Sequence, residues 1–139
     1  MFLLDTNVIG EVRKGKRANP NVRAWFLHHA SEAHYLSVLT VGEIRRGIEQ
    51  IRKKDPAQAL VFEKSLAEIM VIFEGRILGV GLDEAAIWGR LCPHERLPDA
   101  DGLMAATAIG HGLVVASRNT NDFLRSGVEI VNPWEFSES

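Results

Sequence analysis

The sequence predicts an α/β fold in which a mainly parallel central sheet is flanked by helices. Short apolar segments alternate with helical segments along the whole chain, which is the order of successive strand–helix units. The strand segments are continuous apolar runs, as in strands that are covered on both faces. With 139 residues, of which 46% are hydrophobic and 24% charged, the chain suits one globular domain. We therefore expect residues 1–139 to form a single α/β/α domain with about five short strands.

The first strand–helix unit places an acid where the strand ends. Residues 2–4 form a short apolar strand, and apolar residues recur at helical spacing over residues 8–12. Asp5 therefore lies between the strand and the helix, where ligands bind in open parallel sheets. The simpler interpretation is that Asp5 or Thr6 caps the helix.

The second unit begins with a basic loop and ends with another acid. Residues 13–17 form this loop, Pro20 opens a helix, and residues 35–39 form the second strand. Thr40 and Glu43 fit the S/T-x-x-E capping box, which gives Glu43 a purely structural interpretation. The helix that follows has its apolar stripe at Val41, Ile44, Ile48 and Ile51.

The middle of the chain predicts a pair of helices and a third strand. A polar turn at residues 53–56 separates the preceding helix from a long helix at about 57–73, so we expect a helical hairpin at about 40–74. The apolar residues of this long helix exceed one helix face. A short strand at 76–80 and a helix that begins at Asp83 follow.

The stretch 97–108 predicts a helix that is buried against the sheet. Asp99 and Asp101 lie in its first turn, where free backbone N–H groups and the helix dipole favour negative charge. Small and apolar residues without charge follow them. Asp99 as a cap and Asp101 as a surface residue is the simpler interpretation. Strands at 113–116 and 128–131 complete the predicted sheet.

The charge distribution and the cysteine count bear on which partners and which cellular compartment suit the chain. The net charge of −2 argues against a polyanionic partner, but residues 1–54 carry +5 and residues 55–139 carry −7. Such a chain can present a basic face around an acidic site, or two ordinary solvated surfaces. Cys92 is the only cysteine, which excludes an internal disulfide and fits a reducing cytoplasm. The N-terminal apolar run ends at Asp5, so we expect neither a signal peptide nor a membrane span.

Four acids share one structural context. Asp5, Glu43 and Asp122 each follow a predicted strand by a few residues, and Asp101 opens the buried helix. Because the carboxyl ends of parallel strands meet at one edge, these side chains can converge. Converging carboxylates repel one another unless a cation lies between them, and hard oxygen ligands suit Mg²⁺ or Mn²⁺. Such a cluster supports metal-assisted hydrolysis of a phosphodiester bond.

Four short motifs follow one another along the chain and contain the four acids. They are Leu4–Ile9, Thr40–Glu43, Asp101–Ala108 and Ser117–Phe123. In order and spacing they resemble the motifs of the PIN-domain nucleases, and those of the VapC-type toxins of bacterial toxin–antitoxin pairs in particular, while residues 132–134 and the length are most similar to the FitB branch. The resemblance implies an Mg²⁺- or Mn²⁺-dependent ribonuclease that is inhibited by a cognate, DNA-binding antitoxin of the VapB/FitA type and forms a homodimer.

Site residues follow from the positions of these motifs. By resemblance, Asp5, Glu43 and Asp101 are the central metal ligands and Asp122 is a fourth acid. Thr6 and Asn119 support the cluster through hydrogen bonds. Ser117 stands where threonine is usual in the family. Asp99 lies close to Asp101, and the choice of Asp101 rests on its place directly before the Gly-Leu-Met-Ala-Ala run.

Two surfaces are assigned to macromolecular partners. The predicted hairpin holds an antitoxin tail over the acids, with Leu60, Phe62 or Leu66 as its apolar contacts, or else these residues complete the core or a homodimer contact. Basic residues are expected to place RNA across the acids. They are Arg13, Lys14, Lys16, Arg17, Arg45 and Arg46.

Other classes of protein fit less well. A phosphatase of the haloacid-dehalogenase type needs a second Asp two residues after the first, and this position is Asn7. A response-regulator receiver needs a lysine late in the chain, and no lysine follows Lys64. The remaining alternative is a binding module with weak nuclease activity that helps a DNA-binding antitoxin to hold its operator. RNA cleavage with and without Mg²⁺ distinguishes the two.

Overall fold

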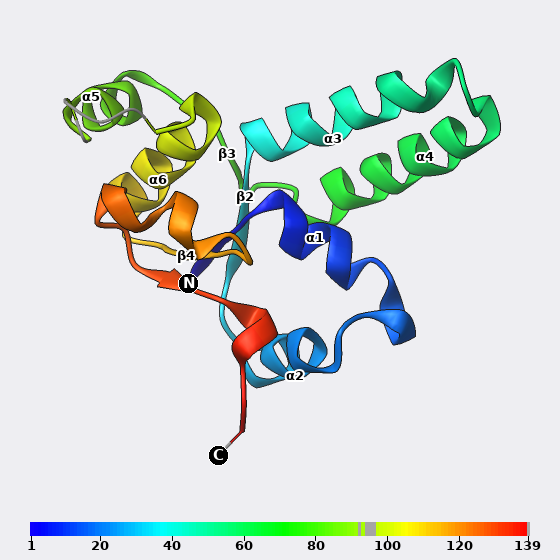
Figure 1. The fold of residues 1–139 in the computed structure, drawn as a ribbon, viewed down its shortest axis with the longest axis horizontal. Helices are drawn as coiled ribbons and strands as arrows, with labels where there is room; N and C mark the ends of the chain where they lie inside the picture. Colours follow the sequence, from blue (N-terminus) through cyan, green and yellow to red (C-terminus); the bar gives the residue numbers. More distant parts are fainter. Residues whose placement is uncertain (92, 94–96, 139) are drawn as a thin grey trace.

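A central parallel sheet with helices on both faces forms the body of the protein (Figure 1). The structure is a computed structural model, and it describes residues 1–91, 93 and 97–138. Cys92, at the predicted end of one helix, lies outside the described residues. None of the helices in the described part of the chain is long and apolar enough to cross a membrane.

The sheet has five strands in the order β3-β2-β1-β4-β5, and all neighbours are parallel, as the sequence predicts. The first strand is central: Leu3 pairs with Tyr35 on one side and with Val115 on the other. This position explains why the first strand is apolar throughout, because both edges and both faces of β1 are covered. The strands are β1 (Phe2–Leu4), β2 (His34–Ser37), β3 (Ile77–Leu78), β4 (Val114–Ala116) and β5 (Ile130–Val131).

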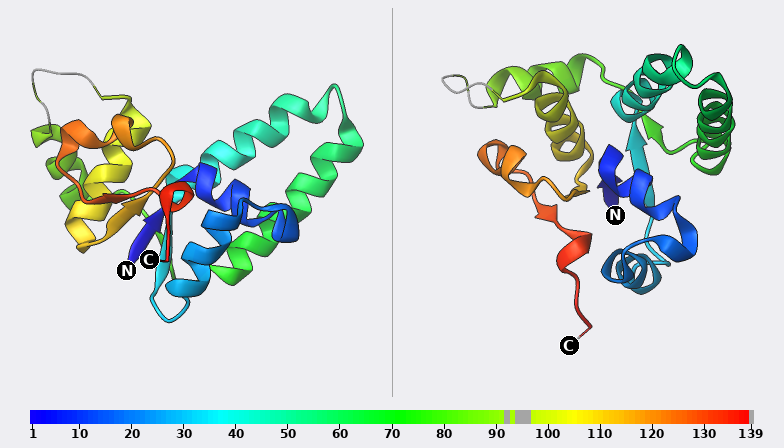
Figure 2. Two further views of the ribbon diagram at one scale, coloured as in Figure 1. Left: turned by 60° about the horizontal axis from the view of Figure 1, so that its bottom comes forward. Right: turned by 45° about the vertical axis from the view of Figure 1, so that its right-hand side comes forward.

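Helices connect the strands and cover the two faces. They are α1 (Thr6–Val12), α2 (Pro20–His28), α3 (Val38–Arg52), α4 (Pro56–Ile72), α5 (Leu82–Arg90) and α6 (Asp99–His111), with 3₁₀ turns η1 (Gly15–Arg17), η2 (Thr120–Asp122), η3 (Leu124–Ser126) and η4 (Pro133–Glu135). Two views show α3 and α4 running side by side on one side of the sheet, and α5 and α6 on the other (Figure 2).

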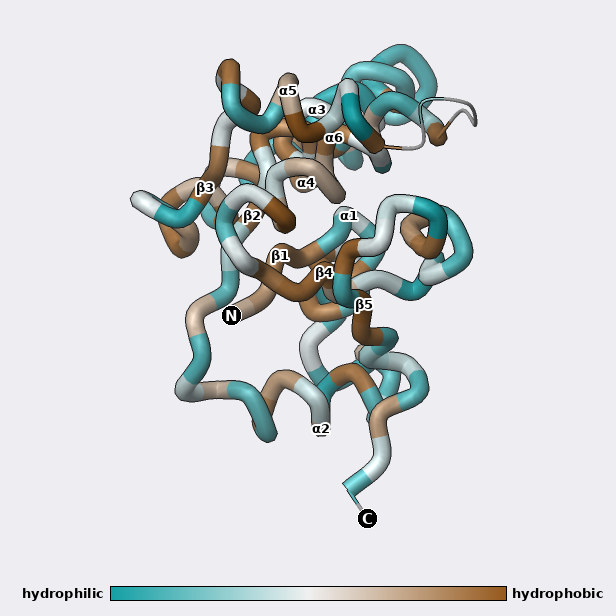
Figure 3. Tube along the Cα trace, turned by 90° about the vertical axis from the view of Figure 1, so that its left-hand side faces the viewer, coloured by the Kyte–Doolittle hydropathy of each residue, from teal (hydrophilic) through white to brown (hydrophobic). Residues whose placement is uncertain are grey.

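Successive residues of β1 contribute to two separate cores. Phe2 and Leu4 pack with Trp25 on the face that α1 and α2 cover. Leu3 packs with Met104 of α6 and with Phe123 on the opposite face. Hydrophobic residues accordingly follow β1, β4 and β5 through the middle of the molecule (Figure 3). This alternation fixes β1 in register, and with it the position of Asp5 at its end.

Helices α3 and α4 form the α3–α4 hairpin, which has an apolar layer of its own. Ile48 of α3 packs with Ala59 and Leu66 of α4, all fully or almost fully buried. The predicted stripe of α3 is confirmed, since Val41 and Ile44 pack against this layer. The structure thus contains two antiparallel helices close to the range expected from the sequence.

The predicted capping box of α3 is wrong. The second strand ends at Ser37, and the Ser37 hydroxyl accepts a hydrogen bond of 3.0 Å from the Leu39 N–H, so the helix begins at Val38. Thr40 is therefore inside the helix and fully buried. Because the helix begins earlier, Thr40 and Glu43 lie inside α3 and do not cap it, so the Glu43 carboxyl is free to make other contacts.

Asp99 and Asp101 occupy the first turn of α6, as predicted, but the residue at the N-cap is Pro98, which offers no side-chain cap. Asp99 is therefore not the cap. Gly102 sets the close approach of α6 to α5, because a Cβ at this position would lie 2.9 Å from the Trp88 ring. This contact fixes the first turn of α6, and Asp101 with it.

Candidate active site

Four acids from different elements come together at the carboxyl edge of the sheet. Asp5 directly follows β1, Glu43 lies in the second turn of α3, Asp101 lies in the first turn of α6, and Asp122 lies in η2 after β4. We call these residues the acid site. The charges of the other three members all raise the pKa of Asp101, so the four carboxylates share one electrostatic environment.

Asp5 is the buried member of the acid site, and its carboxylate accepts three hydrogen bonds. Its side chain is only 7% exposed. Oδ1 accepts from the Thr6 N–H at 2.8 Å, so Asp5 does cap α1. Oδ2 accepts from the Ser117 hydroxyl at 2.7 Å and from the Asn7 side-chain amide at 3.2 Å. The capping interpretation and the functional one are therefore compatible, since the cap fixes the carboxylate at the strand end.

Asn7 is a contributor that the sequence reasoning did not assign to the site. Its amide nitrogen lies near both Asp5 Oδ2 and the Ser117 hydroxyl, and its Oδ1 accepts from the Arg118 N–H at 3.2 Å. Asn7 thereby joins the first turn of α1 to the loop after β4. A second polar residue close behind Asp5 is the signal that could have indicated this role.

Glu43 is held by the hydroxyl of Thr6, the first residue of α1. The Thr6 hydroxyl donates to Glu43 Oε1 at 3.3 Å and lies 3.5 Å from the hydroxyl of buried Thr40. Glu43 sits at the protein surface. Its pKa is raised, first because neighbouring protein displaces water from the carboxyl and then because of the charge of Asp5. The Thr6 hydrogen bond and the positive charge of Arg46 partly offset this effect.

Asp101 carries the clearest electrostatic signature. Its pKa is raised to about 6, first by partial burial and then by the charges of Asp5, Asp122 and Glu43, in that order. Such a shift means that the folded protein disfavours the charged form of Asp101. A pKa perturbed by burial and by specific like charges is typical of functional sites.

The loop after β4 supports the acids through Ser117 and Asn119. The Asn119 N–H donates to the Ser117 hydroxyl at 3.0 Å, and Asn119 precedes η2, which carries Asp122. Within the described residues, the contacts of Asn119 to this loop are made by its backbone. Asp122 is exposed and acts on the site through its charge on Asp101.

The side chains of the acid site are of the type that binds a divalent cation, but they are not arranged as a complete set of ligands. Over residues 1–91, 93 and 97–138, no three His, Cys, Asp or Glu side chains are placed so that they could hold a metal ion as they stand. The donors are nonetheless all carboxylate oxygens, which suit Mg²⁺ or Mn²⁺. The raised pKa of Asp101 also records a repulsion that a bound cation would relieve.

The predicted RNA-contacting residues fall into two groups. Arg13, Lys14 and Arg45 form ion pairs with Glu68 at 3.3 Å, Glu11 at 3.0 Å and Glu63 at 2.7 Å, respectively. In the part of the chain that the structure describes, Lys16, Arg17 and Arg46 have no ion pair. Arg46 is the member of the set whose charge reaches the acid site, because it lowers the pKa of Glu43.

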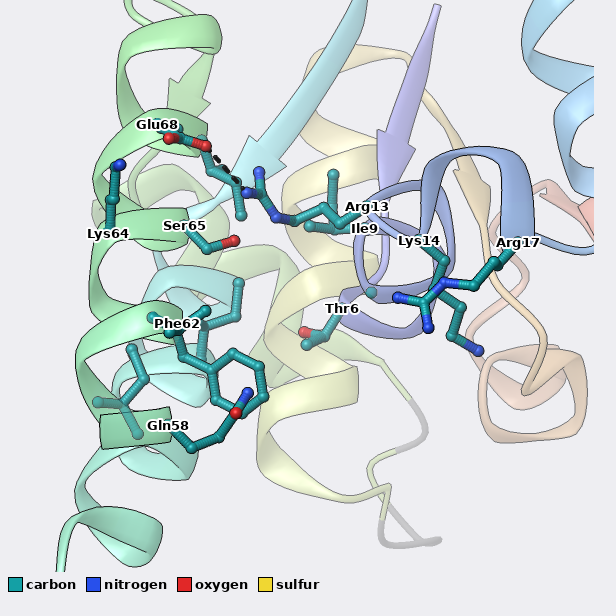
Figure 4. A pocket seen from close by; sticks show the side chains of 15 residues that line it. Thr6, Ile9, Arg13, Lys14, Arg17, Gln58, Phe62, Lys64, Ser65 and Glu68 are labelled. Atoms are coloured by element: carbon teal, nitrogen blue, oxygen red, sulfur yellow. Dashed lines mark hydrogen bonds and ion pairs between the residues drawn. The ribbon is translucent and has the colours of Figure 1, made fainter. Parts of the chain in front are cut away.

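A groove of about 740 Å³ runs beside the acid site, between α1 and the α3–α4 hairpin. Thr6 lies on its wall, and Phe62 and Gln58 of α4 point across toward α1 (Figure 4). Phe62 is 44% exposed and lines the groove, whereas Leu60 is 61% exposed but does not line it. Leu66 is only 2% exposed and belongs to the hairpin core, so of the two interpretations the core one holds for Leu66 and a partner contact does not.

Comparisons with known proteins agree on one family. The family model described as "PIN domain" matches residues 2–128. "VapC ribonuclease Y4jK" of Sinorhizobium fredii is 37% identical over an alignment 145 positions long, which covers 97% of this chain and 99% of that protein. "Toxin FitB" of Neisseria gonorrhoeae is also 37% identical, over an alignment 142 positions long that covers 96% of this chain and 99% of the toxin.

Solved structures give the same result for the fold. A chain in the crystal structure of FitAcB from Neisseria gonorrhoeae superimposes with a TM-score of 0.86 at 36% identity, covering 98% of this chain and 100% of that one. A chain of FitAB bound to an IR36 DNA fragment gives a TM-score of 0.85 at 34% identity, covering 99% of both chains. At 18% identity, a chain of VapBC2 from Rickettsia felis shares the fold with a TM-score of 0.69, covering 94% of this chain and 97% of that one.

Proposed function

This chain belongs to the PIN-domain family, in the group of the FitB and VapC toxins, and from that premise we propose that it is the toxin of a toxin–antitoxin pair and cleaves RNA. The reaction is hydrolysis of a phosphodiester bond. A water oxygen bonds to phosphorus, the bond from phosphorus to the leaving oxygen breaks, and the leaving oxygen gains a proton. The similarity to a VapC ribonuclease supports this class of reaction, and the similarity to the toxin FitB supports the toxin assignment.

The observation that carries the proposal is the position of four carboxylates, from distant parts of the chain, at one edge of the sheet. Partial burial and then the charges of Asp5, Asp122 and Glu43 raise the pKa of Asp101 to about 6. Asp5, Glu43, Asp101 and Asp122 would together hold Mg²⁺ or Mn²⁺. When bound, such a cation lowers the pKa of a water and neutralises charge on the phosphate.

The other residues of the site orient these ligands. Ser117 and Asn7 donate to one oxygen of Asp5, which directs the second oxygen toward the helix cap. Thr6 donates to Glu43 and restricts the carboxyl that α3 presents. Such outer hydrogen bonds commonly change metal affinity by about 10- to 100-fold when they are removed.

The decisive experiment is RNA cleavage by purified protein freed of any partner. We expect cuts in total RNA with Mg²⁺ or Mn²⁺, none with a chelator, and none by Asp101→Asn under either condition. Calorimetric titration with Mn²⁺ should show binding by the wild type and a large loss in Asp101→Asn. Equal Mn²⁺ affinities would overturn the assignment of Asp101.

A partner is proposed for the groove between α1 and the α3–α4 hairpin. The similar chains in FitAcB and FitAB were solved as complexes, which supports a cognate antitoxin for this chain. The groove offers apolar contacts at Val61 and Phe62 beside the basic side chains of Arg17 and Lys64. An antitoxin tail lying there could place a cationic side chain at the acid site, in competition with a metal.

Phe62→Asp tests this partner site, with Leu60→Asp as its control. Both side chains are exposed on α4, but only Phe62 lines the groove. We expect Phe62→Asp to remain folded, to cut RNA and to escape inhibition by the antitoxin, whereas Leu60→Asp remains inhibited. If Phe62→Asp becomes monomeric while inhibition persists, this surface belongs to a homodimer instead.

The alternative function is a binding module with weak nuclease activity that helps a DNA-binding antitoxin to hold its operator. The similar chain of FitAB was solved on a DNA fragment, which supports a role for this chain in a DNA-bound complex. Two results together would support this alternative. The wild type would show no metal-dependent RNA cleavage, and Asp101→Asn would leave operator binding by the toxin–antitoxin pair unchanged. For either function we propose the cytoplasm as the compartment, where both RNA and operator DNA are present.

A further inference from the structure

The acid site presents a problem for any RNA substrate, because its four carboxylates repel the phosphate backbone. Strand binding therefore needs positive charges beside the acids that protein carboxylates have not already neutralised. Arg13 and Arg45 are engaged in ion pairs with Glu68 and Glu63. We propose that Arg118, which the sequence reasoning did not select, binds a phosphate of the RNA strand beside the acid site. This inference rests on the proposed function.

The backbone of Arg118 is fixed next to the acid site. The preceding residue is Ser117, whose hydroxyl donates to Asp5 at 2.7 Å. The Arg118 N–H itself donates to Asn7 Oδ1 at 3.2 Å. Two hydrogen bonds thus tie the backbone of this short segment to the strand end and to α1.

An aromatic ring orders the side chain of Arg118. Its Cζ lies 5.3 Å from the centre of the Trp134 ring, a cation–π contact. Trp134 is anchored in turn: its N–H donates to Asn132 at 2.9 Å, and its carbonyl accepts from Asn21 at 2.7 Å. A guanidinium held in this way loses less conformational entropy when it binds a phosphate than a freely rotating one would.

The N–H groups of Arg118 remain available to a ligand. Over the described residues, its guanidinium makes neither an ion pair nor a hydrogen bond. Glu11 is the acid whose pKa responds to Arg118, but its two oxygens already accept from the Asn19 N–H at 2.9 Å and from Lys14 at 3.0 Å. The exposed guanidinium can therefore bind a phosphate in its two-pronged geometry.

Arg46 supplies the matching charge on the other side of the site. It is exposed on α3, and its charge lowers the pKa of Glu43. Arg46 lies beside the α3 acid, and Arg118 beside the end of β4. The strands that precede these two arginines, β2 and β4, lie on either side of β1, which ends at Asp5, so an RNA strand bound by both would extend along the edge of the sheet that carries the acids.

The test measures binding of a single-stranded RNA oligonucleotide by fluorescence anisotropy at several salt concentrations. All proteins carry Asp101→Asn so that the RNA stays intact. Arg118→Ala should weaken binding about tenfold, the effect of one charge-assisted hydrogen bond. It should also reduce the slope of log affinity against log salt by about 0.7, the value for one phosphate contact on a single strand. Arg118→Lys should keep the slope and lose only part of the affinity.

Arg23→Ala is the matched control, because Arg23 is an exposed arginine of α2 and has no ion pair in the described part of the chain. It should bind RNA like the parent protein. In the otherwise wild-type protein, Arg118→Ala should raise KM for RNA more than it lowers kcat. Thermal unfolding of each variant checks that the fold is retained.

Equal affinities and salt slopes for Arg118→Ala and its parent would overturn the inference while RNA cleavage by the wild type still stands. A loss of affinity with an unchanged salt slope would overturn it too, because Arg118 would then act on the fold of the loop. If the wild type cuts no RNA and Asp101→Asn binds none, the proposed function fails, and the inference with it.

Discussion

Charge is arranged in opposite ways at the acid site and on the α3–α4 hairpin. On the hairpin, Glu63 accepts from Arg45 at 2.7 Å and from Arg52 at 3.2 Å, and its pKa is lowered, first by the Arg45 hydrogen bond. At the acid site, Asp101 faces three other carboxylates, and its pKa is raised to about 6. The hairpin thus brings opposite charges together in ion pairs, whereas the acid site brings like charges together.

The rigid parts of the fold maintain this difference. Asp5 follows a strand that both cores of the sheet fix in register, and Asp101 lies in a helix turn that packs against Trp88. The charged side chains of the hairpin lie at the surface instead, and they form ion pairs with one another. Carboxylates with perturbed pKa values at fixed positions are typical of functional sites, whereas exposed ion pairs contribute little even to stability.

The largest effect should come from removing a carboxylate of the acid site. Asp5→Asn should lower metal-dependent RNA cleavage by at least about a hundredfold, because even outer-shell changes at metal sites cost about 10- to 100-fold. Glu63→Gln is the matched change on the hairpin and should leave the cleavage rate unaltered. A substantial loss in Glu63→Gln would show that the two regions are not functionally separate.

The next largest effect should come from the hydroxyl that holds Asp5. Ser117→Ala removes the 2.7 Å hydrogen bond and should weaken Mn²⁺ binding by about 10- to 100-fold, as measured by calorimetry. Ser117→Thr should retain most of the affinity. Ser126→Ala is the control, since Ser126 also donates a short hydrogen bond, to the Phe123 carbonyl at 2.6 Å, but its described hydrogen bonds involve none of the four acids. Comparable losses in both alanine variants would indicate a general effect on folding.

A smaller effect concerns the stability of the metal-free protein as a function of pH. The pKa of Asp101 is about 6 in the folded protein and near its ordinary value of 3.8 in the unfolded chain. Protonated Asp101 therefore stabilises the fold below about pH 4, and this contribution is lost as the pH rises through about 6. The Tm of Asp101→Asn should rise relative to that of the wild type between about pH 4 and pH 7.

Asp83→Asn serves as the control for this pH series, because Asp83 also lies in the first turn of a helix, α5, and is exposed. It should show no such relative gain in Tm. A constant difference between Asp101→Asn and wild type across the pH range would mean that the other carboxylates do not act on Asp101 in the folded protein.

The sequence was sufficient for the parallel sheet and for the sites of the acids, because strand ends follow from local patterns. Asp5 and Asp101 lie where the alternation of strands and helices placed them. It misjudged the start of α3, since Ser37 and Thr40 are both good caps and tertiary packing decides between them. Thr40 is buried because α1 crosses beside α3, which no local pattern reveals.

Contacts between distant segments account for the remaining differences. Asn7 binds Ser117 and Arg118 across 110 residues of sequence, and Arg13 pairs with Glu68 on a helix far along the chain. Leu66 looked like a surplus apolar residue, but it fills the hairpin core beside Ile48. A count of basic or apolar residues cannot tell which are already engaged, because that depends on the packed structure.

The smallest effect should be that of Glu63→Gln on stability. The substitution removes the ion pairs to Arg45 and Arg52, but Arg52 keeps its two hydrogen bonds to Glu49 at 2.8 and 2.9 Å. Exposed ion pairs gain little because water already solvates both partners, and salt screens what remains. We expect a Tm close to that of the wild type in low salt and indistinguishable from it in 0.5 M salt. Leu66→Ala on the same helix should instead lower the free energy of unfolding by about 2–5 kcal/mol, since it opens a cavity in the hairpin core. A large Tm loss in Glu63→Gln that persists in high salt would show that charge pairing, and not the apolar layer, holds the hairpin together.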